Sequence, residues 1–291
     1  MNDNQKQMRI YLALVLGVCY LLGAAAFLTG GTTDTAAYQF LHKGFTAFPV
    51  LAAFFTRRIT KDTSPLRLSL KVWKNAKLWL FSAFVPALLI AVGAALYYVI
   101  FPAEYSGVFA LGSLMGSEDT IPVRNPLIFA AVCVLISAVC IPIHLIELGE
   151  EIGWREYLLP KQIEQYGVQK AVLINGLEWG VAHLPLIYFG FNYSNANPGA
   201  PWSNMAMMLL VCIVIGILCS YVMVKSGNVM YSAIIHGAVN IIGEIPVFLS
   251  VSQQSGLLGP NPTGVIGMAG MILCAVILIF RLGKPENQQI G

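Results

Sequence analysis

Long apolar runs, separated by short polar segments, dominate the pattern of the chain. A helix needs about 20 mostly apolar residues to cross the hydrocarbon core of a membrane. The runs predict membrane helices over residues 9–29, 38–56, 78–101, 127–149 or beyond, 171–190, 204–224, 230–250 and 264–281. The second is the weakest, because His42 and Lys43 interrupt it. We therefore expect an all-α, multi-pass transmembrane helical bundle of about eight helices, forming one integral membrane domain over residues 1–291.

The first apolar run could be taken for a secretory signal peptide, because Lys6 and Arg9 precede it and alanines follow at 24–26. The apolar core of a signal peptide is usually about 7–15 residues long. This run extends from residue 10 to residue 28. We therefore expect a retained first span and not a cleaved leader.

The basic residues follow the positive-inside rule if both ends of the chain are cytoplasmic. Among the lysines and arginines, only Lys43 and Arg124 then fall at or within outer segments. This distribution predicts a multi-pass protein of the plasma (inner) membrane with cytoplasmic N and C termini. The most basic segment, 57–77, also contains Leu66, Leu70 and Trp73. It predicts an interfacial helix on anionic lipids, which makes membrane lipids expected partners and nucleic acid an unexpected one.

Composition agrees with the membrane class. The chain is 57% hydrophobic and only 11% charged, whereas a soluble domain usually carries about 25% charged residues. The six cysteines fall in apolar segments without C-x-x-C spacing. We expect them to pack in the core and to form neither disulfides nor a metal cluster.

Ionisable residues inside membrane spans are rare and indicate function by default. In the fourth predicted helix, Glu151 and Arg155 are four residues apart and can form a pair on one face. His144 and Glu147 continue that face. Glu150 is rotated from Glu151 by about 100°, so one carboxylate can pair with the arginine while the other stays available. We expect the helix to continue unbroken from about 127 to Leu159, before Pro160.

Two later helices carry further polar pairs at helical spacing. Trp179 and His183 share a face in one, and His236 and Asn240 share a face in the other. Measured along each helix from the nearest inner lysine, Glu150, His183 and His236 lie at similar depths of about 17–20 Å. We therefore expect three helices to bring polar groups together inside the membrane.

The remaining polar residues favour plainer roles. A lone histidine such as His144 is typical of an interhelical hydrogen bond. Glu178 and Glu244 are interpreted as structural or boundary residues, although Glu244 extends the face of His236 by two turns.

The set can perform peptide hydrolysis. Glu150 with His183 could activate a water molecule, and His236 with Asn240 could donate hydrogen bonds to the resulting oxyanion. A zinc site formed by Glu150, His183 and His236 is an alternative. The second alternative is a non-enzymatic immunity or partner-binding protein that uses the same network for helix packing. The third alternative is a proton-coupled transporter. The sequence contains neither H-E-x-x-H nor G-x-S-x-G.

Three motifs carry a family resemblance. The chain reads EEIGWR at 150–155, WGVAH at 179–183 and HGAVN at 236–240. In order and spacing these resemble the E-E-x-x-x-R, F-x-x-x-H and H-x-x-x-N motifs of the CPBP family, which comprises the type II CAAX prenyl endopeptidases and their bacterial abortive-infection and bacteriocin-processing relatives. Trp179 replaces the common phenylalanine. The resemblance covers a motif-bearing catalytic core over about 127–250.

The resemblance implies an intramembrane glutamic endopeptidase without metal or other cofactor. It implies that Glu150 activates water with His183, that His236 and Asn240 form the oxyanion hole, and that Glu151 and Arg155 support them. The implied partner is a peptide or protein substrate, with membrane-associated and lipidated substrates among the options. Bacteriocin immunity is a further role that the family suggests.

Overall fold

The computed structural model describes residues 2–112, 118–139, 145–252 and 256–284. His144, assigned above to helix packing, lies outside these residues. The long helices are α1 (Asp3–Leu28), α4 (Ala76–Ile100), α10 (Val168–Tyr188) and α11 (Trp202–Ser226). The shorter ones are α2 (Ala36–Gly44), α3 (Phe48–Thr60), α6 (Pro126–Val139), α8 (Leu148–Glu151), α9 (Leu159–Tyr166), α12 (Met230–Gly243), α13 (Ile245–Phe248) and α14 (Ala269–Leu282).

The described segments contain little else. Short 3₁₀ turns lie at η1 (Val72–Lys74), η2 (Pro102–Glu104) and η3 (Leu145–Glu147), and a π-helical segment, η4, covers Ile152–Leu158. Two strands, β1 (Val108–Phe109) and β2 (Ile121–Pro122), pair antiparallel. Residues 3–28, 76–100, 202–226 and 230–248 are long and apolar enough to cross a membrane, and α6 and α14 are shorter apolar helices. The expected all-α membrane bundle is confirmed, whereas the number of eight spans and their orientation remain predictions.

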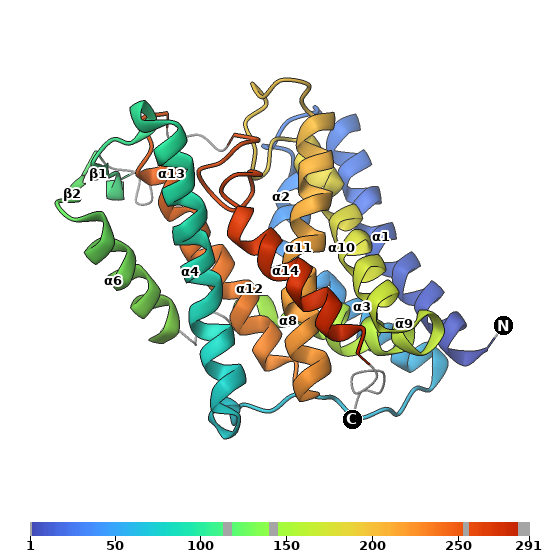
Figure 1. Cartoon of the computed structure of the whole chain (residues 1–291). Helices are drawn as coiled ribbons and strands as arrows, with labels where there is room; N and C mark the ends of the chain where they lie inside the picture. The colour runs from blue at the N-terminus through green and yellow to red at the C-terminus, as the bar shows by residue number, and fades with distance from the viewer. Residues whose placement is uncertain (1, 113–117, 140–144, 253–255, 285–291) are drawn as a thin grey trace.

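The helices α10 and α11 form the centre of the bundle (Figure 1). They approach closely because Gly176 and Gly216 face each other: a Cβ added to Gly216 would lie 3.1 Å from the Cα of Gly176. Small residues permit such close crossings in membrane bundles. On the two sides of this pair, α1 packs on α10 and α14 packs on α11, while α12 lies between α11 and α4.

Three expected elements differ from the sequence prediction. The second apolar run is not one helix but α2 and α3, separated by residues 45–47, because Pro49 in the first turn of α3 has no N–H to continue the helical hydrogen bonds back to Phe45. The fourth run is not an unbroken helix: a 3₁₀ turn precedes α8, and a π-helical segment follows it. The predicted end of this run at Leu159 is also wrong, because the chain continues into α9. Pro160 lies in the first turn of α9, where its missing N–H costs no hydrogen bond.

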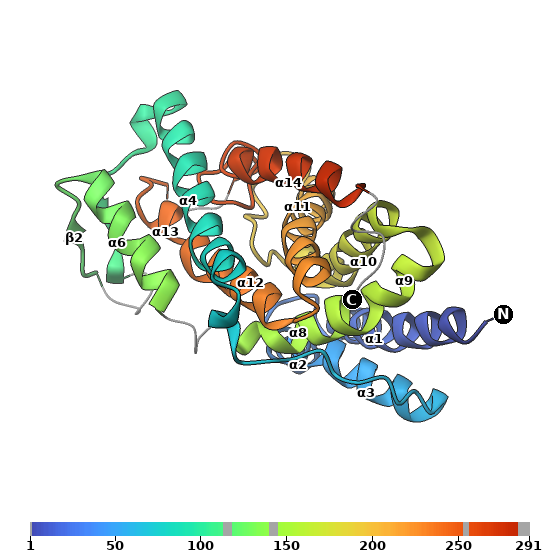
Figure 2. The same ribbon diagram turned by 60° about the horizontal axis from the view of Figure 1, so that its bottom comes forward.

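The third difference is the predicted interfacial helix over 57–77. Helix α3 ends at Thr60, and an extended strap then runs along the bottom of the molecule to α4 (Figure 2). Arg67 accepts a backbone hydrogen bond from Val229, and Ser69 exchanges two hydrogen bonds with Asn228. These contacts with the loop before α12 replace helical hydrogen bonds. The prediction was wrong because the stretch Asp-Thr-Ser-Pro at 62–65 disfavours a helix.

An ion pair anchors the start of the strap. Lys161 Nζ lies 3.1 Å from Asp62 Oδ2. Burial alone would raise the pKa of Asp62, but hydrogen bonds from Ser64 and the charge of Lys161 outweigh burial and hold that pKa at about 2. The aspartate is therefore ionised at neutral pH, and the strap is tied to α9.

Candidate active site

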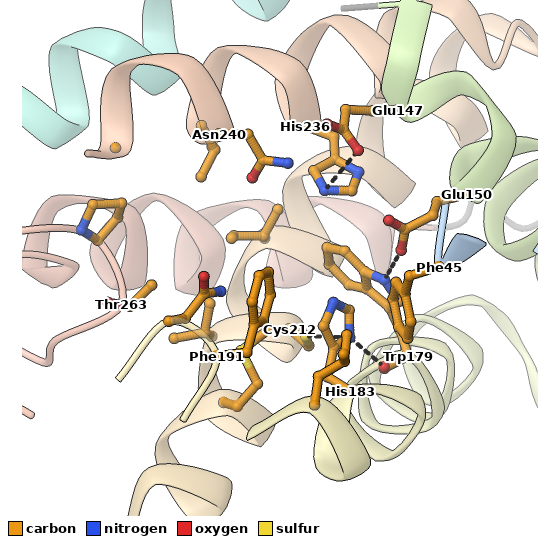
Figure 3. A pocket seen from close by; sticks show the side chains of 18 of the residues that line it. Phe45, Glu147, Glu150, Trp179, His183, Phe191, Cys212, His236, Asn240 and Thr263 are labelled. Carbon is orange, nitrogen blue, oxygen red and sulfur yellow. Dashed lines mark hydrogen bonds and ion pairs between the residues drawn. The ribbon is translucent and has the colours of Figure 1, made fainter. Parts of the chain in front are cut away.

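A cavity of about 400 Å³ opens between α8, α10, α11 and α12. Four of the six residues predicted from the sequence line it, namely Glu150, His183, His236 and Asn240 (Figure 3). The other two, Glu151 and Arg155, lie behind it with no exposed surface. The structure thus brings together polar groups from three segments that are far apart in the chain.

Glu150 is positioned by a hydrogen bond from the indole of Trp179. The Trp179 Nε1–H donates to Glu150 Oε2 across 2.7 Å, and both side chains are buried. A carboxylate oxygen that accepts such a bond leaves the second oxygen, Oε1, available to the cavity. Phenylalanine, which is common at the position of Trp179 in the motif, has no group that could make this contact.

His183 is held in one tautomer by its own helix. Its Nδ1 lies 2.9 Å from the backbone oxygen of Trp179. A carbonyl can only accept, so Nδ1 carries the proton and Nε2 has a free lone pair. Phe45 packs on the imidazole, with ring centroids 4.4 Å apart. His183 can therefore accept a hydrogen bond from a water molecule in the cavity.

Glu151 and Arg155 form the buried pair that their spacing predicted. Arg155 Nη1 donates to Glu151 Oε1 across 3.0 Å, and neither side chain is exposed. The same oxygen lies 3.0 Å from Nδ1 of His236. Gly216 leaves the space that the guanidinium occupies, since a Cβ there would lie 3.1 Å from Arg155 Nη2. The pair thus fixes the orientation of the His236 ring.

Trp179 connects the site. Its ring lies under the guanidinium of Arg155, with 4.2 Å from Cζ to the ring centroid. The same ring meets the imidazoles of His183 and His236 edge-on, at centroid distances of 5.5 Å and 5.0 Å. Trp179 therefore contacts Glu150, Arg155 and both histidines.

Asn240 lies one turn beyond His236 on α12, and both side chains project into the cavity (Figure 3). It is exposed to that space. Two donors one helical turn apart on one wall, facing Glu150 and His183, make an arrangement that could bind an oxygen anion.

Glu147 belongs to the site although the sequence argument gave it no role. Its Oε2 lies 3.7 Å from Nε2 of His236, and it is almost as buried as Glu150. Its position three residues before Glu150 could have indicated this. Phe45 was not predicted as a site residue either. No sequence pattern predicts that the end of α2 contacts α10.

One group of side chains could hold a metal ion. Ligand atoms of Glu147, Glu150 and His236 all lie within 4.8 Å of one another. The zinc alternative predicted from the sequence used His183, whereas among the described residues Glu147 takes its place. Two carboxylates and one imidazole are a donor set that suits zinc, so the geometry fits a cation as well as a metal-free reaction.

The two carboxylates expected to be structural differ from each other. Glu178 accepts a 2.6 Å hydrogen bond from Gln162, which also accepts one from Asn175, and Glu178 does not line the cavity. Glu244 does line it, so its interpretation as a boundary residue is incomplete.

Known proteins are similar to the segment that contains this site. A family model described as type II CAAX prenyl endopeptidase Rce1-like matches residues 125–242, which contain all six predicted residues. The "CAAX prenyl protease 2" of Methanococcus maripaludis is 25% identical over 180 residues, which cover 61% of this chain and 54% of the relative. The chain therefore spans about half the length of this curated relative.

Proposed function

We propose that this chain, whose residues 125–242 match the family model of the type II CAAX prenyl endopeptidases, is an intramembrane glutamic endopeptidase. The observation that carries the proposal is the shared anchoring of Glu150 and His183 by Trp179, at one wall of a cavity whose other wall presents His236 and Asn240. The cavity lies among apolar helices, so we expect a membrane-associated peptide or protein substrate.

In the proposed reaction a water molecule attacks the peptide carbonyl carbon. Glu150 removes one proton from the water, and His183 Nε2 accepts a hydrogen bond from its other O–H group. A new C–O bond forms, and the carbonyl oxygen becomes an oxyanion. When the tetrahedral intermediate collapses, the C–N bond breaks and Glu150 gives its proton to the departing amine nitrogen. The products are a carboxylic acid and an amine.

The oxyanion needs hydrogen-bond donors in place before the reaction. The Asn240 side-chain amide supplies one. His236 Nδ1 faces Glu151, so Nε2 can donate only if the ring carries both protons. The carboxylates of Glu147 and Glu151, at the two ring nitrogens, stabilise that imidazolium.

A metal-dependent hydrolase is the second candidate, because Glu147, Glu150 and His236 could together hold a cation. Such an ion would supply a Lewis acid and an activated water. The two candidates predict opposite effects of metal removal. For the glutamic peptidase, cleavage of a peptide library by the purified protein keeps its rate within about twofold after dialysis against 1,10-phenanthroline. Loss of cleavage that added Zn²⁺ restores would favour the second candidate.

Replacement of Trp179 by phenylalanine tests the positioning of Glu150. The variant keeps an aromatic ring but loses the N–H donor to Glu150. A hydrogen bond to a charged group contributes about 1.5–3 kcal/mol, so we expect kcat to fall by about 10–100-fold with little change in KM. Steady-state cleavage assays measure this effect. Trp202→Phe, at an exposed tryptophan, is the matched control, and equal rates in both variants would remove Trp179 from the positioning of Glu150.

A further inference from the structure

The cavity extends along α12 beyond the oxyanion donors. His236, Asn240 and Glu244 follow one another at intervals of one helical turn, and all three line the cavity. Glu244 is eight residues from His236, so it lies about 12 Å further along the helix. A carboxylate therefore occupies the part of the cavity that is remote from Glu150.

Glu244 differs from the other enclosed carboxylates in having no partner. Glu151 is paired with Arg155, Glu156 with Arg57, and Glu178 with Gln162. For Glu244, which is partly buried, the described part of the chain provides no side-chain hydrogen bond and no ion pair. A carboxylate removed from water without compensation is costly.

The charge of the cavity also indicates that Glu244 lacks a cationic partner. Three carboxylates line it, those of Glu147, Glu150 and Glu244, and no lysine or arginine of the described segments does so. His236 compensates the first two at the inner end. The described residues provide no ion pair for Glu244, and a positively charged group of a bound molecule would supply the missing partner.

We propose that Glu244 binds the cationic side chain of a lysine or arginine in the substrate. This inference rests on the proposed peptidase function and adds the class of peptide to it. An extended peptide advances by about 3.3 Å per residue. The distance of about 12 Å from His236 therefore places the basic residue three to four positions from the scissile bond.

The test compares peptides that are identical except for lysine, glutamine or glutamate at three or four positions on either side of the scissile bond. For the wild type we expect kcat/KM to be about tenfold or more higher with lysine than with glutamine. In Glu244→Gln this ratio falls to within about twofold. In Glu244→Lys the preference inverts, and the glutamate peptide becomes the best of the three. Each comparison is a ratio within one variant, so a general loss of activity does not affect it.

Glu178→Gln is the matched control, because Glu178 is a partly buried carboxylate outside the cavity, and it keeps the wild-type ratio. A lysine preference that persists unchanged in Glu244→Gln would overturn the inference and leave the peptidase intact. The same holds for a wild type that cleaves the three peptides equally well. A wild type that cleaves none of them would overturn the proposed function, and the inference with it.

Discussion

Glu150→Gln is expected to lower kcat for peptide cleavage by about 10³-fold or more, because general base catalysis is worth about 10²–10⁴-fold and Glu150 is the carboxylate that Trp179 holds in place. The amide of glutamine can still accept the hydrogen bond of Trp179, so the cavity keeps its shape. It cannot take a proton from water. Cleavage of a peptide library by the purified protein, followed by mass spectrometry, measures the loss.

The control for this variant is Glu178→Gln, which also removes a partly buried carboxylate but not one that lines the cavity. We expect it to cleave at a rate within about threefold of the wild type, since changes outside a site seldom affect the chemical step. Both proteins should elute from a sizing column as the wild type does. Wild-type rates in Glu150→Gln would remove Glu150 from the reaction.

Arg155→Met is expected to have the largest effect on stability. Glu151 has no exposed surface, so loss of the arginine leaves a buried carboxylate with His236 as its one remaining charged partner among the described residues. Breaking a buried ion pair in this way costs about 3–5 kcal/mol. Unfolding of the purified protein in detergent, followed by circular dichroism, measures the change.

The double variant Glu151→Gln/Arg155→Met distinguishes charge from packing. It removes both charges and keeps an oxygen that can accept from His236 Nδ1, so we expect most of the lost stability to return. This follows because replacing a whole buried pair is often neutral. A double variant no more stable than Arg155→Met alone would show that the unpaired charge of Glu151 is not the cause of the lost stability.

The longest helices were predictable from the sequence, and several irregular elements were not. Apolar runs at 76–100 and 202–226 became single helices, because an uninterrupted apolar run in a membrane leaves the backbone no other way to satisfy its hydrogen bonds. The break between α2 and α3 and the strap at 62–71 depend on Pro49 and on pairing with Asn228. Apolar and basic spacing carries no information about such local hydrogen bonds.

In the candidate site, too, some contacts were predictable from the sequence and others were not. Spacing within a helix predicted the pair of Glu151 and Arg155, since residues four apart share a face. The contact between Trp179 Nε1 and Glu150 joins two separate helices. It depends on how each helix is rotated, and here Glu150 is followed by the π-helical segment Ile152–Leu158. One sequence does not determine that rotation.

In the proposed reaction, water activated by Glu150 attacks the peptide bond directly. Single-turnover cleavage of the best library peptide in H₂¹⁸O, with 1,10-phenanthroline present, tests it. We expect one ¹⁸O atom in the new carboxylate of the product and none in the Glu150 side chain, as read by mass spectrometry of the products and of the digested protein. Label in the Glu150 carboxylate, or no cleavage by the wild type, would contradict it.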